Sequence, residues 1–325
     1  PAPADVTNAI ADRANELLGD FRNVKRVPFE QAVKSDLVER FDFREHYVAD
    51  LENVIDFDVI RSSGVRLGID PLGGASVNYW PLMNEKYNLT IDVVRPQVDP
   101  TWSFMTIDHD GKIRMDPSSP YAMKGLVDSL NNGAWDKYDL VGGTDPDADR
   151  IGIAVRNLHG ELELLNGNQT NTVLISYLLE RWRKQGRLNG KQFIGSTIVT
   201  SDIFYKIADL YGVKCKAGLT GFKWIADMIR RAEGQEEFVG GGEESFGFMV
   251  GDFVRDKDSI TTTILACEVA SVAKAKGSSF FQELLKIYQK TGMYRESLVN
   301  IVREGVSGAQ QIKAMMDTLR ENPLK

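Results

Sequence analysis

Three acidic side chains stand at alternate positions in the segment GTDPDADR, residues 143–150. These residues, Asp145, Asp147 and Asp149, directly follow a short and mostly apolar stretch. Alternate residues of an extended or tightly turned loop can converge on one hard cation, and Mg²⁺ prefers carboxylates together with substrate oxygens. Arg150 comes next, and its guanidinium group is a fork of donors that suits phosphate. A cation site beside an arginine indicates phosphoryl-transfer chemistry.

Other interpretations of this acidic segment also have to be weighed. A calcium loop of the EF-hand type needs glycine at its sixth position and glutamate at its twelfth, where this chain has Arg150 and Arg156. That geometry is therefore disfavoured. A Mg²⁺-dependent phosphatase that uses Asp145 as its nucleophile stays open, because such enzymes also place acids after a buried strand. A solvated charged turn is the simplest alternative.

A glycine-rich segment, GGGEESFG at residues 240–247, contains a second possible binding loop. Glycine lets backbone amides approach a ligand closely, and the carboxylate of Glu243 and the hydroxyl of Ser245 could each bind sugar hydroxyls. The alternative is a glycine-rich hairpin whose acids are solvated.

Two further segments place positive charge at the start of expected helices. In LTGFKW, residues 219–224, Lys223 lies where free N–H groups and the helix dipole attract anions. The segment RDKDS, residues 255–259, precedes another expected helix, and by itself would be a solvated helix start capped by Asp258 or Ser259.

Composition limits the class of protein. The 325 residues are 42% hydrophobic and 26% charged, which is ordinary for a globular chain of about two domains. The net charge of −7 argues against nucleic acid or an anionic membrane as the main partner. Cys215 and Cys267 fit a reducing compartment, and no apolar run reaches the ~18 residues of a membrane span. We therefore expect a cytoplasmic protein.

The hydrophobic pattern repeats the order strand, turn, helix, strand, which favours a parallel sheet. The order occurs twice, so we predict an α/β fold with two similar mixed-sheet domains in tandem. The expected strands cover 65–69, 89–94, 138–141, 151–155, 161–165, 193–199 and 213–216. The expected helices cover 5–18, 46–55, 76–87, 121–130, 170–184, 203–211, 224–231, 260–275, 280–289 and 303–325. The predicted divisions are 1–40, 41–190, 191–302 and 303–325.

Taken together and in this order, the four segments resemble the α-D-phosphohexomutase family, in particular phosphoglucomutases and phosphomannomutases. The segments DPLGGA at 70–75 and QVD at 97–99 are also similar to that family. The resemblance implies four domains around a cleft, of which this chain would contain the second, with the metal site, and the third, with the sugar site. Residues 1–40 would be the end of the first domain, and 303–325 a linker toward the fourth.

The resemblance also implies the role of each site residue. Asp145, Asp147 and Asp149 would hold Mg²⁺, and Arg150 would lie near the phosphoserine or the transferred phosphate. Glu243 and Ser245 would bind sugar hydroxyls. The substrate side of the cleft would be lined by Thr220, Gly221, Lys223 and Lys257.

Two family segments have no counterpart in the sequence. These are the phosphoserine loop, close to TASHNP, and the phosphate-binding loop RPSGTEP; none of the three histidines follows a serine. Family members move a phosphoryl group between C1 and C6 of a hexose phosphate, with glucose 1,6-bisphosphate as intermediate and activator. Without the serine, we expect this chain to be inactive by itself. Besides the mutase and the phosphatase, a third interpretation of the chain is a non-catalytic sugar-phosphate binding module. The sequence distinguishes neither glucose from mannose nor a monomer from a dimer.

Overall fold

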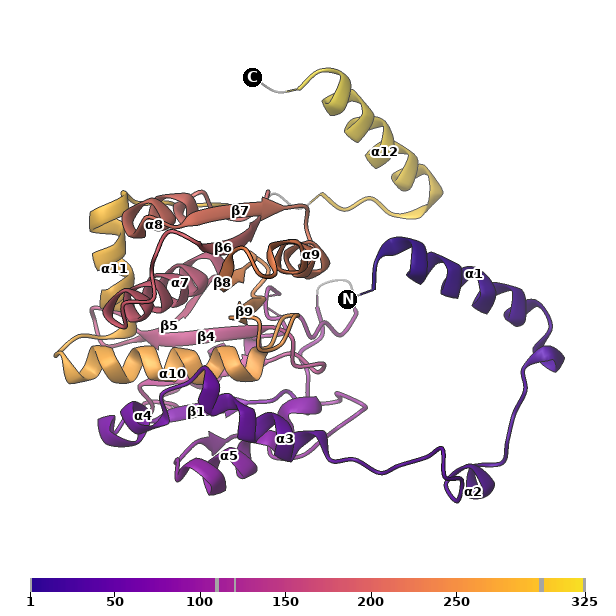
Figure 1. Cartoon of the computed structure of the whole chain (residues 1–325), viewed down its shortest axis with the longest axis horizontal. Coiled ribbons are helices and arrows are strands. Elements are labelled where there is room, and N and C mark those ends of the chain that lie inside the picture. The colour runs from indigo at the N-terminus through magenta and orange to yellow at the C-terminus, as the bar shows by residue number, and fades with distance from the viewer. Residues whose placement is uncertain (1, 109–110, 120, 298–300, 324–325) are drawn as a thin grey trace. The chain divides into compact units, whose positions relative to one another are not determined.

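The computed structural model contains two sheets, each built from parallel and antiparallel strands, with helices packed on them (Figure 1). It describes all residues except 1, 109–110, 120, 298–300 and 324–325. The described chain forms two compact units, Pro1–Met293 and Tyr294–Lys325, and both sheets belong to the first. The expectation of two mixed-sheet α/β domains is confirmed.

The first sheet has the strand order β2-β1-β3-β4-β5. Strand β1 (Leu67–Asp70) pairs in parallel with β2 (Asp92–Val93) and with β3 (Leu140–Thr144). Strand β4 (Ile151–Arg156) runs antiparallel to β3, and β5 (Leu162–Leu165) runs antiparallel to β4, which agrees with the strands expected over 151–155 and 161–165. The acidic segment is therefore the connection between β3, a central strand, and its antiparallel neighbour.

The second sheet repeats this arrangement in the order β7-β6-β8-β9. Strand β6 (Gln192–Thr197) pairs in parallel with β7 (Lys214–Gly218) and β8 (Glu237–Gly242), and β9 (Phe248–Val250) runs antiparallel to β8. Residues 243–247 connect β8 to β9 just as the acidic segment connects β3 to β4. The two candidate binding loops thus occupy equivalent positions in the two sheets.

Four helices accompany the first sheet: α3 (Phe43–Asp50), α4 (Phe57–Ser63), α5 (Tyr79–Tyr87) and α6 (Lys124–Asn131). Helix α4 starts where the side chain of Asp56 accepts a hydrogen bond from a backbone N–H of its first turn, and ends at a glycine with φ of 63°. Several expected elements were too long. The strand over 89–94 is reduced to two residues, and the helix over 121–130 starts at 124. The α-helix expected over 46–55 ends at 50, and the one expected over 76–87 starts at 79.

Five helices accompany the second sheet: α7 (Gly167–Lys184), α8 (Ile203–Tyr211), α9 (Phe222–Ala232), α10 (Ser259–Ala275) and α11 (Phe280–Thr291). Helix α10 is buried on almost all sides, because it packs against α4, β3 and β4 as well as α7 and β9. This helix therefore joins the two sheets into one unit.

The end segments contain α1 (Ala4–Gly19), α2 (Phe29–Ala32) and α12 (Gly305–Glu321). Helix α1 matches the helix expected over 5–18, but none of its described residues is buried. Within the described part of the chain, every helix is too short or too polar to cross a lipid bilayer. Short 3₁₀ helices cover Phe21–Asn23, Leu51–Asn53 and Ala75–Asn78.

Candidate functional site

The acidic loop between β3 and β4 brings its three carboxylates together. One oxygen from each of Asp145, Asp147 and Asp149 lies within 4.8 Å of the others. The turn is closed by Ala148, which has a left-handed φ of 62° and donates its N–H to the carbonyl oxygen of Asp145 at 3.0 Å. The residues predicted to hold a cation therefore converge on one point.

Asp145 is the buried member of the cluster. Its Oδ1 accepts hydrogen bonds from the backbone N–H groups of Asp149, at 3.1 Å, and Arg150, at 2.9 Å. Burial, with a further contribution from the Asp149 carboxylate, raises the pKa of Asp145 to about 8. Among the described residues, Lys257 and Arg150 pair with Asp149, whereas Asp145 is in no ion pair. An all-oxygen donor set suits Mg²⁺ or Ca²⁺. The residues present therefore fit the predicted metal.

The turn after β1 packs against this loop and supports it. The N–H of Ala75 donates to the carbonyl oxygen of Pro146 at 2.7 Å, and the hydroxyls of Ser76 and Thr144 lie 2.9 Å apart. A Cβ added at Gly74 would lie 2.4 Å from the Cα of Pro146. The glycine is needed here because the two backbones touch.

The second loop is built around Glu243, which is buried. Its Oε2 accepts the N–H of Gly221 at 3.3 Å, and burial raises the pKa of Glu243. The side-chain amide of Asn171 donates to the carbonyl oxygens of Glu243, at 3.0 Å, and Gly247, at 3.3 Å. Sequence reasoning missed Asn171, because nothing near it in the chain marks it as part of a site.

The two residues that follow Glu243 differ in their contacts. Glu244 accepts a hydrogen bond from the hydroxyl of Thr200 at 3.0 Å, so it ties the loop to the segment after β6. Ser245 is half-buried in the middle of the loop.

The two loops touch each other. Arg150 and Gly247 form an antiparallel β-bridge, and the N–H of Ile151 donates to the carbonyl oxygen of Phe246 at 3.2 Å. The Nζ of Lys257 lies 2.9 Å from Oδ2 of Asp149. The structure therefore brings together the predicted metal ligands, Arg150, Lys257 and the loop of Glu243.

Arg150 has a second acidic partner that the sequence did not indicate. Its guanidinium pairs with Asp116 and lies 3.6 Å from Oδ1 of Asp149. Asp116 belongs to no motif, so only the fold identifies it.

The segment before α9 reaches the site through one of its predicted residues. Gly221 has φ of 104° and donates its N–H to Glu243. Thr220 and Lys223 are exposed, and the Nζ of Lys223 lies 5.3 Å from the centre of the Trp224 ring. The contact of Gly221 places the start of α9 beside the second loop.

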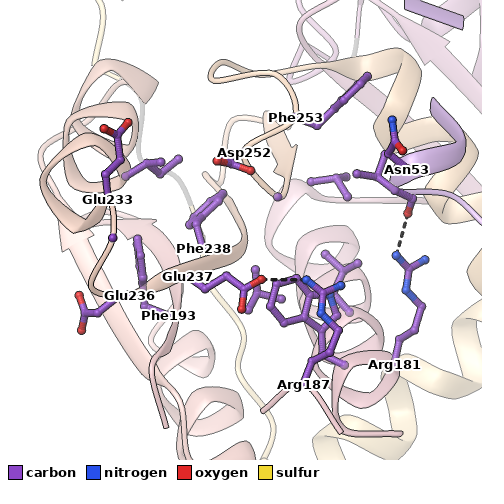
Figure 2. A pocket seen from close by; sticks show the side chains of 18 residues that line it. Asn53, Arg181, Arg187, Phe193, Glu233, Glu236, Glu237, Phe238, Asp252 and Phe253 are labelled. Carbon is purple, nitrogen blue, oxygen red and sulfur yellow. Dashed lines mark hydrogen bonds and ion pairs between the residues drawn. The ribbon is translucent and has the colours of Figure 1, made fainter. Parts of the chain in front are cut away.

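A separate cavity of about 430 Å³ lies at the opposite ends of the strands of the second sheet (Figure 2). Phe193 and Phe238, near the starts of β6 and β8, contribute to its lining. Among its charged residues, Arg187 pairs with Glu237 at 2.8 Å, and Arg181 donates to a backbone carbonyl at 2.8 Å. Charges that are already paired make this cavity a poorer phosphate site than the acidic loop.

Two family models match the chain. "Phosphoglucomutase/phosphomannomutase, alpha/beta/alpha domain II" matches residues 45–160, and the model of domain III matches residues 166–288. The chain belongs to the phosphoglucomutase/phosphomannomutase family. The resemblance stated from the four segments is thereby confirmed, whereas the boundaries that we drew at residues 40, 190 and 302 stay predictions.

Curated relatives in the family are phosphoglucomutases. The protein from Komagataeibacter xylinus is 39% identical over 298 residues, which are 88% of this chain and 50% of that protein. The protein from Staphylococcus aureus (strain USA300) is 32% identical over 297 residues, 91% of this chain and 50% of that protein. This chain therefore spans about half the length of these relatives.

Solved structures share the fold. A putative phosphomannomutase from Thermus thermophilus matches with a TM-score of 0.63 at 21% identity, over 78% of this chain and 52% of that one. A phosphoglucomutase/phosphomannomutase family protein from Burkholderia thailandensis matches with a TM-score of 0.57 at 14% identity, over 77% of this chain and 47% of that one.

Proposed function

We propose that this chain is the metal- and sugar-binding part of a phosphohexomutase. The whole protein would move a phosphoryl group between C1 and C6 of a hexose phosphate, with glucose 1,6-bisphosphate as intermediate and activator. The observation that supports this most directly is the contact between the two loops, in which Lys257 meets Asp149 and Arg150 bridges to Gly247. A cation site and a sugar-binding loop must be adjacent if one phosphorylated sugar is to reach both.

The proposed roles follow from charge and burial. Asp145, Asp147 and Asp149 would hold Mg²⁺, which when bound neutralises charge on phosphate oxygens. Arg150 and Lys257 would contribute fixed positive charge where phosphoryl oxygens gain negative charge, which is the main demand of phosphoryl transfer.

On the sugar side, the buried carboxylate of Glu243 and the hydroxyl of Ser245 would orient sugar hydroxyls. The remaining predicted residues, Thr220, Gly221 and Lys223, would complete the substrate side of the cleft. Gly221 supports this arrangement, because its N–H already holds Glu243 in place.

Similar structures support the ligand chemistry. N-acetylphosphoglucosamine mutase from Aspergillus fumigatus, which matches with a TM-score of 0.52 at 14% identity, is described in complex with GlcNAc-6P and magnesium. A variant of that mutase is described with glucose 1,6-bisphosphate. We propose that this chain binds the same classes of ligand, a metal ion and a hexose phosphate.

The phosphoserine loop of the family has no counterpart in the sequence. We therefore propose that the chain by itself binds its ligands without interconverting them, because it contains no phosphoserine donor. The donor would be supplied by a further segment of a longer protein.

A coupled assay tests this proposal. Glucose 1-phosphate, Mg²⁺ and a trace of glucose 1,6-bisphosphate are given to this chain and to the longest product of its gene, and the release of inorganic phosphate is measured in parallel. Mutase activity in a longer product alone is the expected result. Phosphate release by this chain, with Asp145 trapped by a metal fluoride, would instead favour the phosphatase. Sugar-phosphate binding without turnover in either protein would favour the binding module.

A further inference from the structure

The carbonyl oxygen of Ala148, in the acidic loop, is hydrogen-bonded to Ser259, a residue far along the chain. Ala148 lies between two of the proposed metal ligands, Asp147 and Asp149, and has the left-handed conformation that closes the acidic loop. Its carbonyl oxygen accepts two hydrogen bonds from Ser259, one from the backbone N–H at 3.0 Å and one from Oγ at 2.8 Å. Ser259 is buried, so water does not compete readily for this contact.

Ser259 is itself held firmly as the first residue of α10. The preceding residue, Asp258, accepts hydrogen bonds from the N–H groups of Ile260, at 2.9 Å, and Thr261, at 3.1 Å. The second carboxylate oxygen of Asp258 accepts the hydroxyl of Tyr47, on α3, at 2.6 Å. Since this cap is buried and fully bonded, the start of α10 has little freedom to move.

Two residues of the segment 257–259, Lys257 and Ser259, therefore bind two successive residues of the acidic loop. Ser259 binds the carbonyl oxygen of Ala148, and Lys257 pairs with the carboxylate of Asp149. Alanine does not favour a left-handed conformation, so the loop keeps this shape where surrounding contacts impose it. The double hydrogen bond from Ser259 is such a contact, and it acts on the peptide group that separates two of the proposed ligands.

We propose that Ser259 is a positioning residue, which sets the spacing of the Asp147 and Asp149 carboxylates to suit an ion as small as Mg²⁺. The proposal rests on the proposed function, because it takes the acidic loop as the metal site. Mg²⁺ demands near-octahedral geometry at short distances, whereas Ca²⁺ accepts longer and more irregular coordination. A loop that loses this contact is therefore expected to lose Mg²⁺ affinity more than Ca²⁺ affinity.

The test is calorimetric titration of the full chain with Mg²⁺ and separately with Ca²⁺, before and after Ser259→Ala. The variant keeps the backbone hydrogen bond and loses the one from Oγ. We expect Mg²⁺ affinity to fall about tenfold, within the range found when supporting partners of metal ligands are removed. The fall in Ca²⁺ affinity should be clearly smaller, so that the ratio of the two affinities changes.

Ser271→Ala is the matched control. Ser271 lies on the same helix, is also buried, and donates its Oγ to the carbonyl oxygen of Cys267 at 2.8 Å. The Ser271→Ala variant loses an equivalent hydroxyl away from the acidic loop, so its affinities for Mg²⁺ and Ca²⁺ should stay as in the unaltered chain. If both serine variants change the ratio alike, or Ser259→Ala lowers both affinities equally, the positioning role is wrong.

A second measurement is independent of any metal. The N–H of Asp149 donates to the carboxylate of Asp145 at 3.1 Å. Its hydrogen exchange should become faster in Ser259→Ala and stay unchanged in Ser271→Ala. Mg²⁺ binding that is unaffected by Ser259→Ala would overturn this inference and leave the proposed function standing, whereas no Mg²⁺ binding by the unaltered chain would overturn both.

Discussion

At the scale of single residues, the acidic loop is a place where like charges are held together. Asp145 is buried, and its pKa rises to about 8 because burial disfavours its charged form and the Asp149 and Asp147 carboxylates repel it. Asp147 is exposed, so it adds negative charge to the cluster without supporting the fold. Of the three carboxylates, Lys257 and Arg150 compensate Asp149 only, so a bound cation would stabilise the remaining carboxylates of the cluster.

Asp147→Asn should weaken Mg²⁺ binding by about tenfold or more, because one of three anionic ligands is lost. Thermal unfolding without metal should be unchanged or slightly shifted upward, since repulsion is relieved. Calorimetry and thermal unfolding measure the two effects. Asp36→Asn, at an exposed aspartate outside the site, is the control and should alter neither. Unchanged Mg²⁺ affinity in Asp147→Asn would contradict the assignment.

Glu243→Ala should lower the affinity for glucose 1,6-bisphosphate by about tenfold or more, which corresponds to about 1.4 kcal/mol or more. Mg²⁺ affinity should persist, because the Glu243 carboxylate accepts its hydrogen bond from Gly221 and stands outside the cluster of three aspartates. Glu243→Gln keeps an oxygen that can accept the N–H of Gly221, so it isolates the effect of charge. Loss of sugar-phosphate and metal binding together would point to misfolding instead.

At the scale of elements, the start of α7 supports the sugar-binding loop. The helix begins with a capping box, in which Asn166 and Gln169 each bind the backbone of the other. Gly167, in its first turn, packs against the loop so closely that an added Cβ would lie 2.2 Å from the carbonyl oxygen of Glu244. Because both partners are backbone, the contact cannot be relieved by a side-chain rotation.

Gly167→Ala should therefore reduce the free energy of unfolding by about 1–3 kcal/mol and also weaken sugar-phosphate binding. Gly125→Ala, in α6, is the matched control, since its added methyl group meets no atom within 4 Å. It should leave binding unchanged and stability equal or higher by about 0.5–1 kcal/mol. Denaturant unfolding and calorimetry measure both quantities. Equal effects from the two variants would show that the close packing at Gly167 is unimportant.

At the scale of the whole first unit, α10 connects the two sheets through a buried carboxylate. Glu268 is fully buried and accepts hydrogen bonds from the N–H of Asp56 at 2.9 Å, the hydroxyl of Tyr177 at 2.5 Å and the guanidinium of Arg181 at 2.7 Å. Asp56 caps α4 beside the first sheet, whereas Tyr177 and Arg181 belong to α7. One side chain thus ties both halves to the helix whose first residue holds the acidic loop.

Glu268→Ala should lower the free energy of unfolding by about 3–5 kcal/mol, because it leaves a largely buried arginine without its partner. Glu237→Ala is the control: Glu237 pairs with Arg187 at 2.8 Å, but both side chains are about half exposed. That pair should contribute about 0–1 kcal/mol. Denaturant unfolding, followed by tryptophan fluorescence, compares the two variants. A similar loss of unfolding free energy in both would show that burial of the Glu268 network does not stabilise the fold.

Much of the local structure could be predicted from sequence. The strands expected over 151–155 and 161–165 correspond to β4 and β5, and helical periodicity identified α8 with both of its ends. The strand over 89–94 was overestimated, because only Asp92 and Val93 pair with β1, and the apolar residues Leu89 and Ile91 lie before that pairing. Periodicity indicates which side chains are apolar, whereas the length of a strand depends on how many of its residues pair with the neighbouring strand.

By itself, the sequence determined the kinds of residue available for chemistry and their order, and hence the family. Only the tertiary structure decided which of them meet. Asp116 reaches Arg150 across 34 residues, Asn171 reaches Glu243 across 72, and Ser259 reaches Ala148 across 111. Such contacts arise because two sheets and α10 pack into one unit, and no local pattern of apolar and polar residues specifies which distant backbone groups that packing brings together.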